Sequence, residues 1–314
     1  MTYFIVIIGG GPNGIYAYNQ CRNLFSDKNI LLIEKNEIIN SIKSYPNILW
    51  HSPFHELCFD GENNTNKSHP MGNDVIQYYE KYCKNNNISF LKEKVINIEK
   101  ENENYKIITN NSNIQCKYVI LCTGIYENKN RLDINTNYSY ISYDYCDFSL
   151  RNKHLVLIGG GNSSIDYIIN LLPYNKITWI IRANSHTTNS AHLNLLRNTI
   201  HKYKHNLYYY NNSNVSHFYE NNSLKLSNGK IIDNIDFCNI LIGFNSKNDL
   251  LTNIGIQYDQ YNNIKMNDNY ETNLKNLFIF GSLASTKNDI VYIHNGNPKR
   301  LSKITNYIQN NINS

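Results

Sequence analysis

The chain has 314 residues, of which 41% are hydrophobic and 18% charged, so it is long enough to form two domains of ordinary size. This composition excludes a mini-protein and a disordered tail. The formal net charge is only +5, and Lys and Arg form no run along the chain, which argues against a surface dedicated to nucleic acid.

The first predicted unit is a strand, a glycine loop, a helix and a second strand. Apolar residues 3–8 lead into Gly9, Gly11 and Gly14, which have the G-x-G-x-x-G spacing of a dinucleotide-binding loop. In such a loop the first glycine permits the tight turn, the second lets backbone approach a pyrophosphate, and the third allows close packing. The second strand, residues 30–33, ends at Glu34, which is placed to accept hydrogen bonds from an adenosine ribose. We predict a dinucleotide site formed by Gly9, Gly11, Pro12, Asn13, Gly14, Glu34 and Lys35.

The same pattern returns in the middle of the chain. Residues 154–158 lead into Gly159 and Gly161, and Ser164 replaces the third glycine as a small residue that still permits packing. The next strand ends in Arg182 rather than in an acid. An Arg pairs with a 2′-phosphate by charge-assisted hydrogen bonds, so we predict that this unit prefers NADPH to NADH, although Arg182 could also be a solvated cation. The expected contacts are Gly159, Gly161, Asn162, Ser163, Ser164 and Arg182, with His186 as a further candidate for the same phosphate.

Two such units predict an α/β protein with two Rossmann-like dinucleotide-binding domains. Between them, residues 95–99, 106–109 and 118–122 are expected to be strands separated by Asn-rich turns. After the second unit come strands over 239–242 and 277–280 and a last helix over roughly 298–311. This order fits a dinucleotide domain of residues 125–244 inserted into another of residues 1–124 and 245–314. The acidic ending at Glu34 and the basic ending at Arg182 suit two different cofactors, so we expect FAD in the domain of residues 1–124 and 245–314 and NADPH in the inserted domain.

The cysteine and histidine patterns argue against disulfides and metals. The seven cysteines are Cys21, Cys58, Cys83, Cys116, Cys122, Cys146 and Cys238. They are odd in number and include no C-x-x-C pair, which disfavours a disulfide scaffold and a zinc ribbon. The pairs His51/His55 and His201/His205 lack a third ligand, so no metal site is predicted. Without a signal peptide or a stretch long enough to cross a membrane, we expect a soluble, cytoplasmic protein.

Nearly the whole chain resembles a known family. The strands that end at Gly124 and Gly281 resemble signatures of two-dinucleotide-binding flavoproteins, although Ser282 stands where many of these have Asp. The chain is similar to the bacillithiol disulfide reductase-like family of thioredoxin-reductase-like flavoproteins. The matching stretches are the two glycine loops and residues 33–53, 243–256 and 271–296. The family's distinctive Asn, acid and apolar pair are matched by residues 288–291. The resemblance implies FAD and NADPH as cofactors, with contacts from Tyr45, His51, Val95, Thr123, Gly124, Gly281, Ser282, Asp289 and Ile290.

One position departs from that family. Its members typically carry a cysteine immediately before the third glycine of the first loop, where this chain has Asn13. A cysteine at a helix N-terminus near flavin would have a lowered pKa and could attack a disulfide, which Asn cannot do. Asn13 and His51 are our candidate catalytic residues. Cys58 and Cys122 are alternative thiols, whereas Cys21 is expected to pack in the core.

We therefore predict an FAD-dependent oxidoreductase that takes hydride from NADPH and passes electrons to a small disulfide or thiol-related acceptor. The alternative is a flavin-dependent N- or S-monooxygenase acting on a small metabolite. A third hypothesis is electron delivery to a carrier such as ferredoxin, and a fourth is a non-catalytic dinucleotide sensor. We expect a small-molecule substrate and a homo-oligomer, with neither nucleic acid nor membrane as a partner.

Overall fold

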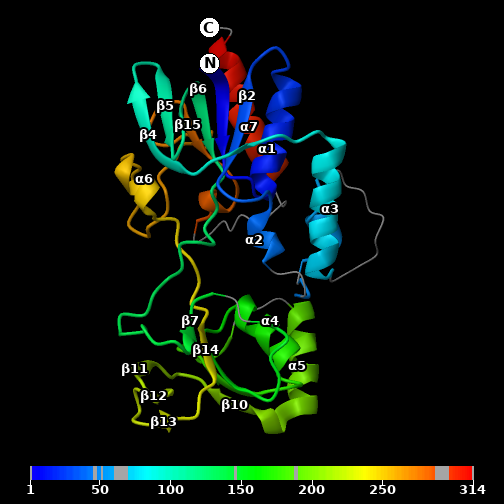
Figure 1. Ribbon diagram of the computed structural model, residues 1–314, viewed down its shortest axis with the longest axis vertical. Helices are drawn as coiled ribbons and strands as arrows, with labels where there is room; N and C mark the ends of the chain where they lie inside the picture. Colours follow the sequence, from blue (N-terminus) through cyan, green and yellow to red (C-terminus); the bar gives the residue numbers. More distant parts are fainter. Residues whose placement is uncertain are drawn as a thin grey trace. The chain divides into compact units, whose positions relative to one another are not determined.

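The computed structural model describes residues 2–44, 48–50, 52–59, 70–144, 147–186, 190–286 and 297–312, which fold into mixed α/β structure (Figure 1). One compact unit combines residues 1–46, 52–128 and 245–314, and the other combines residues 47–51 and 129–244. The sequence analysis placed these boundaries after residues 124 and 244, and the cofactor of each unit stays a prediction. No helix in the described part of the chain is both long enough and apolar enough to cross a membrane.

The first unit is built on a seven-stranded sheet with the order β3-β2-β1-β6-β5-β4, and β15 pairs with β6. β6 pairs antiparallel with β5 through its first half and parallel with β15 through its second half. The sheet therefore joins a parallel part to an antiparallel hairpin. The elements of this unit are β1 (Thr2–Ile8), α1 (Pro12–Leu24), β2 (Ile30–Glu34), α2 (Asn40–Lys43), η1 (Phe54–Glu56), α3 (Gly72–Asn85), β3 (Leu91–Lys92), β4 (Val95–Glu101), β5 (Asn104–Thr109), β6 (Asn113–Leu121), α6 (Asp249–Asn253), β15 (Leu277–Ile279), η3 (Gly281–Ala284) and α7 (Asn297–Ile312).

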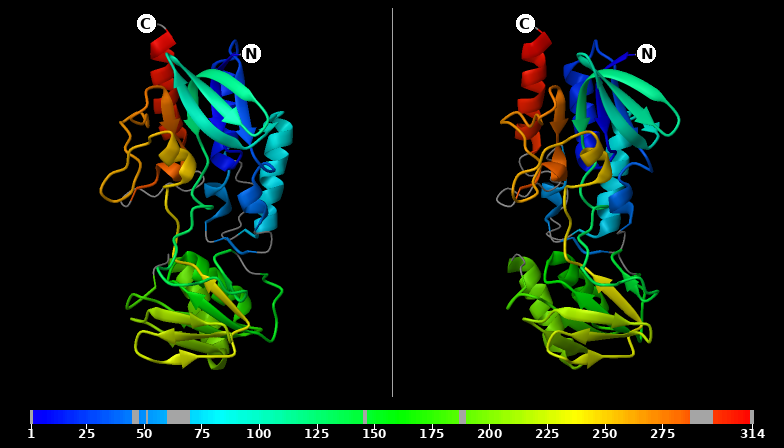
Figure 2. Two further views of the ribbon diagram at one scale, coloured as in Figure 1. Left: turned by 60° about the vertical axis from the view of Figure 1, so that its left-hand side comes forward. Right: turned by 90° about the vertical axis from the view of Figure 1, so that its left-hand side faces the viewer.

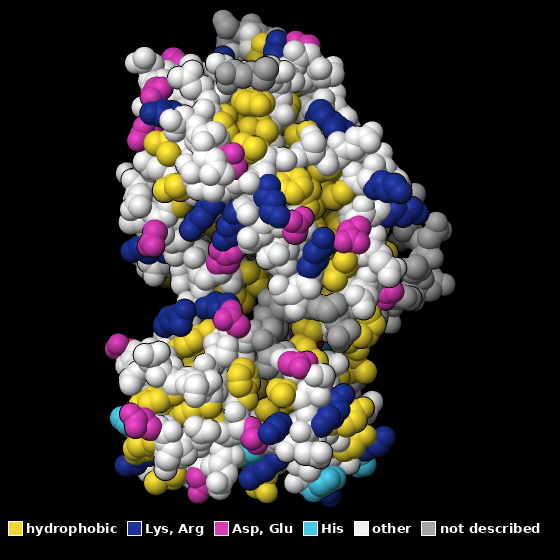
Figure 3. Space-filling view, viewed as in Figure 1, with side chains coloured by type: hydrophobic (Ala, Val, Ile, Leu, Met, Phe, Trp, Pro, Cys, Tyr) yellow, Lys and Arg dark blue, Asp and Glu magenta, His cyan; other side chains and the backbone are white. Residues whose placement is uncertain are grey.

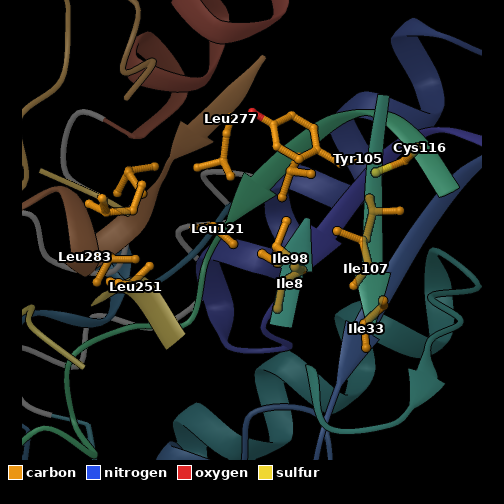
Figure 4. Close-up of a cluster of buried hydrophobic side chains, with 14 of the residues drawn as sticks. Ile8, Ile33, Ile98, Tyr105, Ile107, Cys116, Leu121, Leu251, Leu277 and Leu283 are labelled. Carbon is orange, nitrogen blue, oxygen red and sulfur yellow. The ribbon is translucent and has the colours of Figure 1, made fainter. Parts of the chain in front are cut away.

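The unbroken apolar run of β1 is explained by burial on both faces of the sheet. Ile5 and Ile7 pack in one cluster with side chains of α1 and α7, which lie on one side of the sheet (Figure 2). Val6 and Ile8 pack in a second cluster with β4, β5, β15 and α6, and Figure 4 shows the side chains of this cluster converging from these elements. Because β1 is covered twice, its carboxyl end is held firmly where the glycine loop begins.

The second unit repeats this design with a five-stranded parallel sheet in the order β10-β9-β8-β14-β7. A separate antiparallel sheet has the order β11-β12-β13. The elements of this unit are β7 (Ile141–Ser142), β8 (His154–Ile158), α4 (Asn162–Leu171), β9 (Lys176–Ile180), α5 (Ser190–Tyr203), η2 (Lys204–Asn206), β10 (Leu207–Tyr210), β11 (Val215–Tyr219), β12 (Ser223–Leu226), β13 (Ile231–Ile232) and β14 (Phe237–Ile240).

β8 is also buried on both faces. Leu155 and Leu157 pack with α4 and α5, whereas Val156 and Ile158 pack with the three-stranded sheet. The sequence pattern did not predict this small sheet, because its strands are short and two of them, β11 and β13, are only partly buried. The second glycine loop of the chain, at the end of β8, therefore lies on a scaffold like that of the first unit.

Some element bounds differ from the sequence-based ones. β6 begins at Asn113 rather than near residue 118, because its first half pairs with the hairpin strand β5. β9 ends at Ile180, but the N–H of Ile181 still donates to the carbonyl of Tyr210 at 2.8 Å. Arg182 therefore follows the strand and lies on the loop beyond it.

The abundant asparagine has a structural use in the tight turns. Asn102 connects β4 to β5 with φ of 54°, and Asn222 precedes β12 with φ of 56°. Asn tolerates this left-handed conformation better than most side chains, so it substitutes for glycine there. The many asparagines of this chain are thus compatible with well-formed hairpins.

Candidate functional site

The first glycine loop has the geometry of a nucleotide-binding turn. Gly9 has φ of 108°, and a Cβ there would lie 2.5 Å from the carbonyl oxygen of Cys122. A Cβ on Gly14 would lie 1.7 Å from the carbonyl oxygen of Gly9. At Gly11, by contrast, a Cβ would meet no atom of the described chain within 4 Å. The fold therefore requires glycine at positions 9 and 14, whereas Gly11 leaves open space beside the backbone.

That open space adjoins the N-terminus of α1. Gly11 is the N-cap and supplies no side-chain cap, and Pro12 occupies the first turn. The carbonyl of Gly11 accepts the N–H of Ile15 at 3.0 Å. The N–H groups of the first turn, together with the helix dipole, form the kind of site that binds a phosphate.

Glu34 lies directly against this loop. Its carboxylate accepts the N–H of Gly10 at 2.6 Å and the N–H of Asn36 at 2.9 Å. A Cβ on Gly10 would lie 2.8 Å from the Cβ of Glu34, so the middle glycine of the loop is also required. A carboxylate has about four acceptor positions, which leaves Glu34 able to accept ribose hydroxyls as well. The sequence analysis did not single out Gly10.

Three distant segments meet beside α1. A Cβ added to Gly124 would lie 3.5 Å from the side chain of Ser282. A Cβ added to Gly281 would lie 2.7 Å from the side chain of Asn13. Asn297, at the start of α7, donates from Nδ2 to Oδ1 of Asn13 at 2.5 Å. Asn13 thus links the first turns of α1 and α7.

Asn297 is a site residue that the sequence analysis missed. It is almost fully buried, with 1% of its surface exposed. The available signal was its place before Pro298 at a predicted helix start, because Asn is a preferred N-cap and Pro is favoured in the first turn.

The remaining predicted contacts of the first unit are more scattered. Lys35 forms an ion pair with Glu127 and lies at the surface. Val95 begins β4 and packs at the edge of the second core cluster, while Thr123 is exposed after β6. Tyr45, His51, Asp289 and Ile290 lie outside the described residues. Within the part that is described, no three His, Cys, Asp or Glu side chains come together as a metal site.

The second glycine loop shows the same division of roles. Gly159 has φ of 130°, and a Cβ there would lie 2.2 Å from the carbonyl oxygen of Leu241 on the neighbouring chain segment. A Cβ on Gly161 would meet nothing within 4 Å. Ser164 is fully buried in the first turn of α4, together with the half-buried Asn162. Ser164 therefore does act as the small packing residue at the third position.

Two predicted phosphate contacts follow β9. Arg182 is exposed. His186 is half-buried, and its Cα lies 3.5 Å from the position of a Cβ on Gly160. Burial and the charge of Arg197 lower the pKa of His186, which favours its neutral form.

Each unit thus fits a dinucleotide. Each has a strand followed directly by a positive-φ glycine and an open glycine at a helix N-terminus. Each also has a charged side chain at or just beyond the end of the second strand, Glu34 in the first unit and Arg182 in the second. Residues 6–281 match the profile of the pyridine nucleotide-disulphide oxidoreductases. The chain belongs to this family.

Individual members of the family support this assignment. The ferredoxin–NADP reductase of Ligilactobacillus salivarius is 25% identical over 298 residues, which cover 90% of this chain and 84% of that protein. The thioredoxin reductase of Mycoplasma genitalium is 26% identical over 306 residues, which cover 91% and 88% of the two chains.

The solved structure of the bacillithiol disulfide reductase from Bacillus cereus superposes with a TM-score of 0.89 at 23% identity, and 98% of this chain and 99% of that chain are covered. The predicted resemblance is therefore confirmed at the level of fold. As a pyridine nucleotide-disulphide oxidoreductase, the protein is an NAD(P)-dependent flavin oxidoreductase.

Proposed function

We propose that this oxidoreductase uses NADPH to reduce a small disulfide or a related thiol-derived acceptor, and that it does so without a thiolate of its own. FAD, when bound in the first unit, supplies the two-electron redox chemistry. The observation that carries the proposal is Asn13, which occupies the first turn of α1 and is hydrogen-bonded to Asn297. An amide in this place can donate and accept hydrogen bonds, but it cannot attack sulfur.

The cysteines of the described chain do not replace the missing thiol. Burial raises the pKa of Cys21 and of Cys116 to about 12, and raises that of Cys122 well above its usual range. Burial also raises the pKa of the partly exposed Cys83 to about 11. Cys58 is buried and donates its thiol hydrogen to the carbonyl of Phe54 at 3.2 Å.

Cys21, Cys83, Cys116 and Cys122 therefore stay protonated near neutral pH, and the thiol form is a poor nucleophile. Cys238 is also buried with a raised pKa, and Cys146 lies outside the described residues. The acceptor is therefore proposed to take its electrons directly at the flavin.

The first test is the identity of the cofactor. The purified protein should be yellow, and denaturation should release FAD and not FMN, because the glycine loop and Glu34 fit an adenosine diphosphate that FMN lacks. Chromatography of the released flavin measures this directly. A colourless protein that also fails to take up added FAD would overturn the proposal.

The second test is the choice of nicotinamide cofactor. Arg182→Ala should lower kcat/KM for NADPH about 10- to 150-fold and leave that for NADH nearly unchanged, because it removes one charge-assisted phosphate contact. Arg151→Ala is the matched control, since Arg151 is also exposed in the second unit but binds the carbonyls of Phe148 and Leu150. Equal losses with both cofactors would show that Arg182 is structural.

A second candidate acceptor is ferredoxin, because one relative of this chain is a ferredoxin–NADP reductase. Such an acceptor would need a cationic docking surface. On the face of the first unit seen in Figure 3, Lys and Arg side chains are interspersed with Asp and Glu, so that face offers no continuous cationic surface. We place the small acceptor first because the solved structure that superposes over 98% of this chain is that of a bacillithiol disulfide reductase. The enzyme is first reduced by NADPH without oxygen and is then mixed, in separate experiments, with ferredoxin, with a small disulfide or with O₂. The acceptor that reoxidises the flavin separates disulfide reductase activity from ferredoxin-dependent and oxygenase activity.

A further inference from the structure

Trp179 makes an unusual contact with the second glycine loop. It lies on β9 with 1% of its surface exposed, and its indole Nε1–H donates to the carbonyl oxygen of Gly159 at 2.8 Å. A buried Trp needs a partner for its N–H, and here that partner is the first glycine of the fingerprint. The side chain of one strand thus reaches the loop that follows the neighbouring strand.

This contact acts at a residue whose backbone is tightly constrained. Gly159 has φ of 130° and passes so close to the carbonyl of Leu241 that a Cβ would lie 2.2 Å from it. A glycine in an open turn can rotate its peptide group freely. The bond from Trp179 fixes the direction of the Gly159 carbonyl and hence of the peptide that leads to Gly160.

The same indole ring contacts the segment after β9. The centroid of the His186 ring lies 5.3 Å from that of the Trp179 ring. The centroid of the Tyr209 ring, on β10, lies 4.9 Å from it. His186 in turn approaches the backbone of Gly160. Trp179 therefore connects the glycine turn with the segment of residues 182–186, the two parts of the unit that would contact the pyrophosphate and the adenosine end.

We propose that Trp179 is a positioning residue for NADPH, which holds the turn of Gly159 and the segment of His186 in their bound arrangement before the cofactor arrives. The inference rests on the proposed use of NADPH by this unit. A preformed site binds more tightly because less ordering is needed on binding. Removing the indole N–H also leaves the Gly159 carbonyl without this donor, which loosens the turn.

The test is Trp179→Phe, which keeps an aromatic ring and removes the donor. We expect the Kd for NADP⁺, measured by titration calorimetry, to rise about 5- to 30-fold, the range that corresponds to one lost buried hydrogen bond. FAD content and kcat at saturating NADPH should stay unchanged. A positioning role thus appears as a change in Kd and KM without a change in kcat.

Thr178→Val is the matched control. Thr178 is the preceding residue of β9, has 2% of its surface exposed, and its hydroxyl contacts Nε2 of His154 at 2.8 Å. Loss of this hydroxyl destabilises the same strand but leaves the contacts of the glycine turn in place. The Kd for NADP⁺ should therefore change less than about twofold, while Tm falls. If Thr178→Val weakens NADP⁺ binding as much as Trp179→Phe does, or if Trp179→Phe binds as the wild type does, the proposal is wrong.

A fluorescence titration decides the matter even if Trp179→Phe does not fold. The chain has two tryptophans, so Trp50→Phe leaves Trp179 as the single indole emitter. We expect its emission to change on titration with NADP⁺, with the same midpoint as the calorimetric Kd. Calorimetric binding without any change in emission would contradict the proposal. Failure of the wild type to bind NADP⁺ at all would instead overturn the proposed function of the unit.

Discussion

Gly14→Ala should abolish FAD binding and destabilise the first unit by more than about 3 kcal/mol, which places it among the most damaging single substitutions. The added Cβ would lie 1.7 Å from the carbonyl oxygen of Gly9, a backbone atom that cannot rotate away. Gly9 itself is confined, because it passes close to the backbone of Cys122 and Thr123. The measurements are the FAD-to-protein ratio after gel filtration and the Tm of the apoprotein.

Gly11→Ala is the control for this experiment. Its Cβ would meet no described atom within 4 Å, so the apoprotein should keep its Tm within the effect of an ordinary surface substitution. FAD affinity should nevertheless fall, because the methyl group would stand where the backbone must approach a pyrophosphate. A Gly14→Ala protein that retains full FAD would contradict the description of this loop. A Gly11→Ala protein with unchanged FAD affinity would show that the cofactor does not use the open space.

Asn13→Cys should create or raise disulfide reductase activity that depends on a protein thiol. The new thiol would lie in the first turn of α1, where the helix N-terminus stabilises a thiolate. A pKa lowered from the usual range to about 7 gives roughly tenfold more thiolate at neutral pH than a free cysteine has. Turnover of NADPH with a small disulfide, with and without alkylation by N-ethylmaleimide, measures the gain.

Two variants separate the thiol from the loss of the amide. Asn13→Ser removes the hydrogen bond to Asn297 but adds no sulfur, and Asn297→Ala removes the same bond from the other side. Neither should gain activity that alkylation removes. If Asn13→Cys shows no alkylation-sensitive activity, or if Asn13→Ser gains as much, the position does not control thiol chemistry. Increased release of peroxide in Asn13→Cys would instead favour the oxygenase alternative, since Asn13 would then support an oxygen intermediate.

The two glycine loops were the features most accessible to sequence reasoning. Each loop is local in the chain, and each glycine has a separate steric or binding reason to be small, as the contacts at Gly9, Gly14 and Gly159 show. The apolar runs of β1 and β8 likewise indicated strands covered on both faces. Patterns of this kind can be predicted because the glycine spacing and the apolar run are each visible within a short stretch of sequence, even where the confining backbone, as at Cys122 and Leu241, is distant along the chain.

Long-range contacts were not accessible in this way. Asn297 lies 284 residues from Asn13, and no periodicity connects them. The bond from Trp179 to Gly159 joins two neighbouring strands, and a buried Trp on an apolar strand is indistinguishable from an ordinary core residue in the sequence. Gly10 was missed because the fingerprint does not require it, whereas in this fold Glu34 packs against it. Such residues become visible only when the packing of the segments is known.

The most direct test of the central claim is the reoxidation rate of the enzyme after anaerobic reduction by NADPH and alkylation of its accessible thiols. The reduced, alkylated enzyme is mixed with glutathione disulfide or bacillithiol disulfide, and the return of the oxidised flavin absorbance is followed. We expect reoxidation by at least one of these disulfides, at the same rate as in the unalkylated enzyme. Loss of reoxidation on alkylation, or reoxidation only by O₂ or ferredoxin, would contradict it.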